Sequence, residues 1–120
     1  MVPKFRCWDE RVGLTEVVSI DFFRKKIKIN HWEYGDSNFF PLDEVVLMQS
    51  TGLKDLKGVE IFEGDIIVWE YSEKPQEVFW DNSICGFSTK HYHLWRTVKK
   101  VKVIGNIYEN PELLEPANEN

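Results

Sequence analysis

The sequence feature that most constrains the fold is the stretch of residues 51–68, TGLKDLKGVEIFEGDIIV. The letters KG at residues 57–58 and EGD at residues 63–65 are turn signals, and apolar and β-branched residues stand between and behind them. This pattern of turn residues and apolar runs predicts one β-hairpin and the start of a second. We therefore expect a fold built from short antiparallel strands around this stretch.

The rest of the chain predicts more strands of the same kind. Alternating, β-branched or aromatic runs occur at residues 3–10, 15–22, 23–32, 45–49, 66–71, 77–80, 84–88, 91–95 and 98–107. In the third run, Ile27 and Ile29 are expected to point inward. Pro75 is expected to end the ladder before it, because proline has no backbone N–H to donate.

Helical signals are short. Residues 42–44 have the acidic start of one helical turn. Asn110 and Pro111 suit the cap and first position of a turn at residues 111–115, which Pro116 ends. We expect a single, mostly β domain over residues 1–120, with a mobile polar tail at residues 116–120.

The stretch of residues 51–68 also contains four acidic residues. Asp55, Glu60, Glu63 and Asp65 would bind a hard cation if a loop brought them together, but they lack the spacing of a calcium-binding loop. The structural alternative places Glu60 on the solvent face of a strand whose Val59 and Ile61 face inward, and uses Asp65 as a turn acceptor. We favour turn and surface roles for the four carboxylates. The apolar positions around Ile61, Ile66 and Val68 are then expected to form the core of a small barrel.

Composition limits the class of protein. With 42% hydrophobic residues the chain is not disordered, and Cys7 and Cys85 make no disulfide framework. We expect two free thiols in a reducing cytoplasm. No apolar run approaches the length of a membrane span and no signal peptide opens the chain, so we expect no membrane partner.

A basic segment is the main indication of binding chemistry. Residues 82–108 contain five cations and no acid, interleaved with aromatic residues. Small β-barrels bind single-stranded nucleic acid by stacking bases on aromatic side chains beside a basic groove. The candidate contacts are Tyr92, Trp95, Arg96, Lys99, Lys100 and Lys102, joined by Lys26 and Lys28 if the strands lie close. In the alternative interpretation the aromatics are core and the lysines protect a strand edge from aggregation.

A metal site is the third possibility. His91 and His93 would lie on one face of a strand, and Cys85 or a distant acid would supply a third ligand. These three residues do not form a recognised zinc pattern, and half-exposed strand histidines explain them equally well. Neither a phosphate-binding glycine loop nor a nucleophile motif is present. We therefore expect no enzyme activity and no cofactor.

Three segments resemble the YopX-like family of small proteins encoded by bacteriophages and prophages. They are KFRCWDE at residues 4–10, VVLMQSTGLKDLKGVEIFEGDII at residues 45–67 and GNIYENPELLE at residues 105–115. Residues 69–102 follow no pattern of that family. The resemblance implies a mostly β fold with a small SH3-like barrel, a phage or prophage origin in a bacterial host, and self-association. It supplies no catalytic or binding residues.

The leading hypothesis is a non-enzymatic accessory protein that acts by protein association. It rests on an aromatic content of 14% without a site motif. We expect a homo-oligomer, with a host or phage protein as a further partner. The alternative is a nucleic-acid-binding regulator that uses residues 90–102, followed by a metal-dependent enzyme.

Overall fold

The computed structural model of the chain describes residues 4–30, 39–70, 72–90, 93–94 and 100–114. Contacts divide the chain into two compact units, unit 1 (Met1–Gln49) and unit 2 (Ser50–Asn120). A single domain over residues 1–120 stays a prediction. The tail predicted at residues 116–120 lies outside the described residues.

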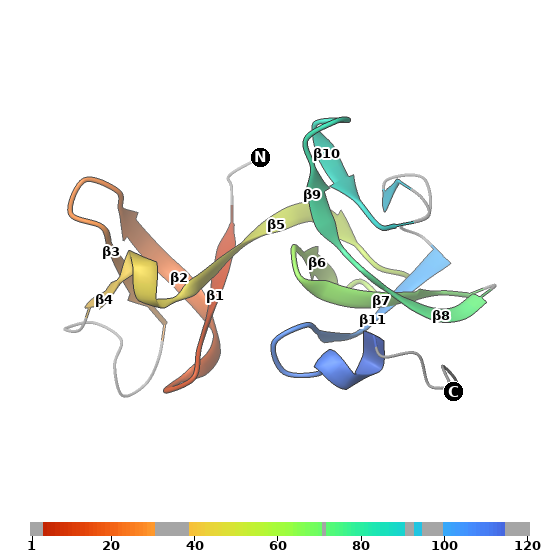
Figure 1. Cartoon of the computed structure of the whole chain (residues 1–120), viewed down its shortest axis with the longest axis horizontal. Coiled ribbons are helices and arrows are strands. Elements are labelled where there is room, and N and C mark those ends of the chain that lie inside the picture. The colour runs from red at the N-terminus through yellow and green to blue at the C-terminus, as the bar shows by residue number, and fades with distance from the viewer. Residues whose placement is uncertain (1–3, 31–38, 71, 91–92, 95–99, 115–120) are drawn as a thin grey trace. The chain divides into compact units, whose positions relative to one another are not determined.

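Unit 1 is built on an antiparallel sheet. Its strands, red to yellow in Figure 1, are β1 (Phe5–Asp9), β2 (Gly13–Asp21), β3 (Lys26–Ile29), β4 (Phe39–Pro41) and the first part of β5 (Val46–Lys54). They pair in the order β4-β3-β2-β1-β5. The strands predicted in the first 32 residues are therefore confirmed, with bounds that differ by a few residues.

The core of unit 1 follows from alternation along these strands. Cys7, Ile27, Ile29 and Phe40 are buried together on one face of the sheet, and the inward direction predicted for Ile27 and Ile29 is confirmed. Partly buried apolar residues pack against this cluster, namely Val12, Val17, Ile20, Leu42, Val45 and Leu47. The opposite face of β3 therefore carries its two lysines.

The strand predicted at residues 23–32 begins later than expected, because residues 22–25 form the turn between β2 and β3. The Asp21 carboxylate accepts a hydrogen bond from the backbone N–H of Arg24 (2.9 Å), and Lys25 adopts a positive φ of 56°. The carbonyl of Lys25 then accepts a bond from the backbone N–H of Leu42 (2.8 Å). The turn is thus tied both to its own strand and to the segment after β4.

The described residues of unit 2 form four antiparallel strand pairings. Its strands are the second part of β5, β6 (Glu60–Phe62), β7 (Asp65–Trp69), β8 (Ser72–Glu77), β9 (Phe79–Asp81), β10 (Gly86–Ser88) and β11 (Val101–Asn106). β5 pairs with β6, β9 pairs with β10, and β7 lies between β8 and β11. Of the strand predicted at residues 91–95, the structure describes only His93 and Leu94.

The core of unit 2 is aliphatic. Ile61, Ile67, Val78, Leu94 and Val101 are fully buried against one another. Ile66 is also buried, as predicted, whereas Val68 is only half-buried. On β11 the predicted alternation is confirmed, since the lysines on either side of Val101 are exposed.

Both predicted turns of residues 51–68 are present, but Val59 and Glu60 differ from expectation. Inside the first turn the Val59 carbonyl accepts the backbone N–H of Asp55, and the Val59 N–H donates to the Asp55 carboxylate. Val59 is 48% exposed rather than inward-facing. Asp55 and Asp65 are buried, and Asp65 accepts the backbone N–H of Phe62 (2.8 Å) as a turn acceptor. Glu60 is half-buried and accepts a hydrogen bond from the Ser50 hydroxyl. The turn role predicted for Asp65 is therefore confirmed, whereas the solvent-face position predicted for Glu60 is wrong.

The prediction for Pro75 is also wrong, because β8 runs through it. Ile66 pairs with Glu77 and Ile67 pairs with Gln76, but the register then shifts before Trp69 pairs with Ser72. Pro75 lies in this irregular part of a strand at the edge of its ladder. A proline is tolerated at such a position, where no ladder bond from its nitrogen is required.

The fold is mostly β and antiparallel, as predicted. The described pairings do not close into a barrel. The two predicted helical turns are present as the 3-10 helices η1 (Leu42–Glu44) and η3 (Pro111–Leu114). No helix among the described residues has the length and apolar character to cross a membrane.

Candidate functional site

The outer face of the unit 1 sheet, opposite its core, carries mixed apolar and basic side chains. The pairing register places Lys28 between Ser19 of β2 and Phe39 of β4. The same register places Lys26 between Asp21 and Pro41. Partners in an antiparallel ladder point to the same side of the sheet, so these residues share one face.

A bulge adds a second apolar side chain beside Lys28. The β2–β3 register shifts between Val17 and Ser19, so that Val18 and Ser19 both stand opposite Lys28. Val18 is 60% exposed and Phe39 is 50% exposed. The ammonium of Lys28 lies 5.9 Å from the centre of the Phe39 ring. We call Val18, Lys28 and Phe39 the Val18–Phe39 face.

The turn between β2 and β3 carries the most exposed aromatic side chains described. Phe22 is 66% exposed and Phe23 is 91% exposed, and Arg24, Lys25 and Lys26 after them are exposed as well. We call residues 22–26 the hairpin tip. The guanidinium of Arg24 lies 3.0 Å from the Asp21 carboxylate, and this arginine, through its backbone and side-chain bonds, lowers the pKa of Asp21.

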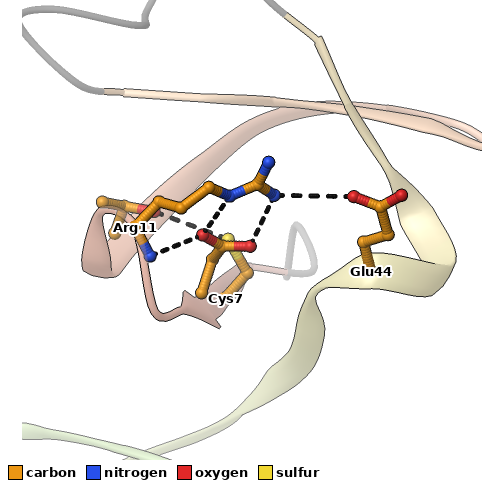
Figure 2. A network of polar contacts seen from close by, with 5 residues as sticks. Cys7, Arg11 and Glu44 are labelled. Carbon is orange, nitrogen blue, oxygen red and sulfur yellow. Dashed lines mark hydrogen bonds and ion pairs between the residues drawn. The ribbon is translucent and has the colours of Figure 1, made fainter.

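A polar network around Arg11 connects the β1–β2 turn with η1 (Figure 2). Arg11 donates from its backbone N–H, Nε and Nη2 to the buried Asp9 carboxylate, at 2.7–2.8 Å, and its side-chain bonds lower the pKa of Asp9. The same guanidinium lies 3.7 Å from Glu44 of η1 and 4.6 Å from the centre of the Phe40 ring. Arg11 therefore links the β1–β2 turn to η1 and β4.

The candidate metal ligands are only partly described. Cys85 is exposed in the β9–β10 turn with a φ of 50°, and the half-buried His93 bridges to Ser88. His91 lies outside the described residues. Among the residues that the structure describes, no three histidines, cysteines or acids come together in a way that would hold a metal. A site that includes His91 stays a prediction.

The candidate nucleic-acid contacts are divided between the two units. Lys26 and Lys28 belong to β3 of unit 1, whereas Lys100 and Lys102 are exposed on unit 2. The remaining candidates, Tyr92, Trp95, Arg96 and Lys99, lie outside the described residues. Each unit therefore carries two of the described candidate lysines.

The aromatic residues of the segment 69–95 are mostly turned toward the core where they are described. Trp69 and Phe87 are half-buried against the core of unit 2. Trp80 is more exposed and meets Phe87 edge-on, with 5.1 Å between the ring centres. The described part of this segment thus supports the interpretation that its aromatics stabilise the fold.

Sequence reasoning missed both the Arg11 network and the hairpin tip. The network connects the neighbours Asp9 and Arg11 with Phe40 and Glu44 from a distant segment, and no local pattern indicated that connection. The tip had a local signal, because aspartate favours turns by accepting a nearby backbone N–H, as Asp21 does from Arg24. The β preference of the run FRKKIKIN outweighed that signal.

Comparisons with known proteins agree with the fold. The family model described as YopX protein matches residues 4–115. The crystal structure of protein EF1440 from Enterococcus faecalis is similar, with 30% sequence identity, a TM-score of 0.71, and coverage of 96% of this chain and 99% of that chain. The comparison with curated proteins found no match. Since the family match spans nearly the whole chain, this protein belongs to the YopX family.

Proposed function

We propose that this member of the YopX family is a non-enzymatic interaction module that self-associates through the Val18–Phe39 face. The observation that carries the proposal is the exposure of two large apolar side chains on one face of the sheet, 60% for Val18 and 50% for Phe39. Burying such a side chain contributes about 1.5–3 kcal/mol. Two copies that associate through the same face would bury four such side chains.

The position of β4 supports the same face. β4 is the last strand in the described pairing order of unit 1, and it carries Phe39. An edge strand offers backbone groups to a second chain, and a two-fold dimer uses the same patch on both copies. Lys28 contributes its aliphatic stem between the two apolar side chains. The face therefore combines a backbone edge with apolar anchors.

Light scattering after size exclusion tests this proposal. The wild-type chain, 14.2 kDa as a monomer, is expected to show a larger mass that increases across a tenfold range of concentration. The double variant V18S/F39S is expected to be monomeric over the same range. The matched control is I84S, which removes an exposed apolar side chain from unit 2 and should leave the mass unchanged. A monomeric wild-type protein at every concentration contradicts self-association.

Nucleic-acid binding is the second candidate function. It is favoured by the exposed Lys100 and Lys102, which stand in a stretch of residues 82–108 without any acid. Reversing these two charges, together with that of Lys99, is expected to abolish binding of a labelled single-stranded oligonucleotide and to leave self-association intact. Binding that is already absent for the wild type at low salt rules this function out.

We also propose an SH3-like barrel, a phage or prophage origin, and a host or phage protein as partner. An SH3-like barrel in unit 2 is supported by the packing of Ile61 from one ladder against Ile67 and Val101 from another. A phage or prophage origin, with action in the bacterial cytoplasm, follows from the family resemblance. A host or phage protein as partner would use the same exposed face as a second copy.

A further inference from the structure

We propose that the hairpin tip of unit 1 docks on an anionic lipid surface. Phe22 and Phe23 are adjacent in the turn and are 66% and 91% exposed. The nine residues 22–30 contain four cations and no acid. Adjacent aromatic side chains followed directly by cations match the two layers of a membrane interface, the apolar boundary and the negative headgroups.

The geometry of the turn presents these side chains outward. Figure 1 shows the turn as the orange loop that joins β2 to β3 at the end of the hairpin. Two bonds hold its shape, from the Arg24 backbone to Asp21 (2.9 Å) and from the Leu42 backbone to the Lys25 carbonyl (2.8 Å). The aromatic pair is therefore displayed by an ordered turn, and docking does not require the turn to fold first.

The charges favour a lipid surface over a specific phosphate or base contact. The Arg24 guanidinium, which would bind a single phosphate in two-pronged fashion, is already paired with Asp21 at 3.0 Å. The exposed cations that remain in the turn are Lys25 and Lys26, which act as point charges without a preferred direction. Lysine ammonium groups beside the two exposed phenylalanines therefore suit a lipid surface, whose negative charge is spread over many headgroups.

The neighbouring element carries two acids, one of which lies close to a cation outside the hairpin tip. The Leu42–Lys25 bond brings η1 close to the turn, and η1 carries Asp43 and Glu44. Glu44 lies 3.7 Å from the Arg11 guanidinium.

Docking of this kind places a protein on a membrane, and it is independent of any spanning segment. It revises the expectation from sequence that the chain has no membrane partner.

Co-sedimentation of the full chain with vesicles tests the proposal. Vesicles of phosphatidylcholine with about one-third phosphatidylglycerol should bind the wild type, and pure phosphatidylcholine vesicles should bind it at least about tenfold more weakly. F22S/F23S should lose about tenfold or more in binding to the anionic vesicles. K25E/K26E should lose as much, and the wild-type binding should weaken at high salt.

The matched control is L56S. Leu56 is also an exposed apolar residue that precedes a lysine in a turn, but it lies in unit 2. L56S should bind anionic vesicles as the wild type does. Unchanged urea midpoints for the tip variants show that any loss comes from the tip and not from unfolding.

Three results would overturn the proposal. They are wild-type protein that stays in solution with anionic vesicles, tip variants that bind as well as wild type, and tip variants that lose oligonucleotide binding while keeping vesicle binding. Light scattering separates this proposal from self-association, because F22S/F23S should keep the wild-type mass. Conversely, V18S/F39S should keep the tip and still bind vesicles as a monomer.

Discussion

The backbone N–H of Val103 donates a hydrogen bond to the carboxylate of Asp55, 2.9 Å away and 48 residues earlier in the chain. The same carboxylate accepts the backbone N–H groups of Lys57 (2.8 Å) and Val59 (2.9 Å). One buried side chain thus closes the first turn of residues 51–68 and attaches that turn to β11.

Replacing Asp55 by alanine should strongly destabilise the protein. The change leaves three backbone donors without their acceptor, and an unsatisfied buried donor costs about 1–3 kcal/mol. We expect the free energy of unfolding in urea, followed by tryptophan fluorescence, to fall by about 2–5 kcal/mol. D43A, which removes an exposed acid, is the control and should change it by less than about 0.5 kcal/mol. Equal effects of the two changes would contradict the role of Asp55.

The same carboxylate predicts a dependence of stability on pH. Burial alone would raise the pKa of Asp55, but the bonds from Val103, Val59 and Lys57, with the charge of Lys102, lower it below its ordinary value. A carboxyl with a lowered folded-state pKa stabilises the protein above its unfolded pKa of about 3.9, and this contribution is lost as the pH falls through the folded-state value.

We therefore expect the difference in unfolding free energy between wild type and D55N to be large at pH 7 and to shrink below about pH 4. Urea titrations at a series of pH values measure it. A difference that stays constant down to pH 2 would mean that the Asp55 charge does not contribute.

A methyl group at residue 105 should not fit. A Cβ added to Gly105 would lie 2.5 Å from Oδ1 of Asn110, whose side chain accepts the backbone N–H of Asn106 (3.2 Å). G105A is expected to lower the free energy of unfolding by about 1–3 kcal/mol. In an N110A background, which removes the clashing oxygen, the same change should cost less. An equal cost in both backgrounds would place the strain elsewhere.

The two thiols should differ sharply in reactivity. Burial raises the pKa of Cys7, which is fully buried beside the Thr15 hydroxyl (3.4 Å), whereas Cys85 is exposed. Since the thiolate is the reactive form, N-ethylmaleimide should label one site, Cys85, in the native protein and two in urea. C85S should show no native labelling. Rapid native labelling of C85S would show that the core of unit 1 opens readily.

The parts of the fold that sequence predicted are those that depend on neighbouring residues. Burial of Ile27 and Ile29 follows from the period of two along a strand, and the turn at residues 57–58 follows from its glycine. Pro75 was misjudged because its tolerance depends on the edge position of β8, which is a property of strand order.

The candidate site was less predictable, for the same reason. Lys26 and Lys28 were recognised as a basic strand face, but their apolar neighbours Val18 and Phe39 come from two other strands. A bulge at Val18 and a pairing to β4 cannot be read from periodicity. Likewise, the bond from Val103 to Asp55 joins segments that only the assembled sheets bring together.

The order of strands in the two units has a consequence for synthesis. Every described pairing of unit 1 lies within the first 49 residues, so its sheet can form while the ribosome is still translating the rest. In unit 2, β7 can pair with β8 once residue 77 has left the exit tunnel. Its pairing with β11 must wait until residue 106 has also left the tunnel. Until then one edge of an apolar strand stays open, and the emerging chain is most vulnerable to aggregation during that interval.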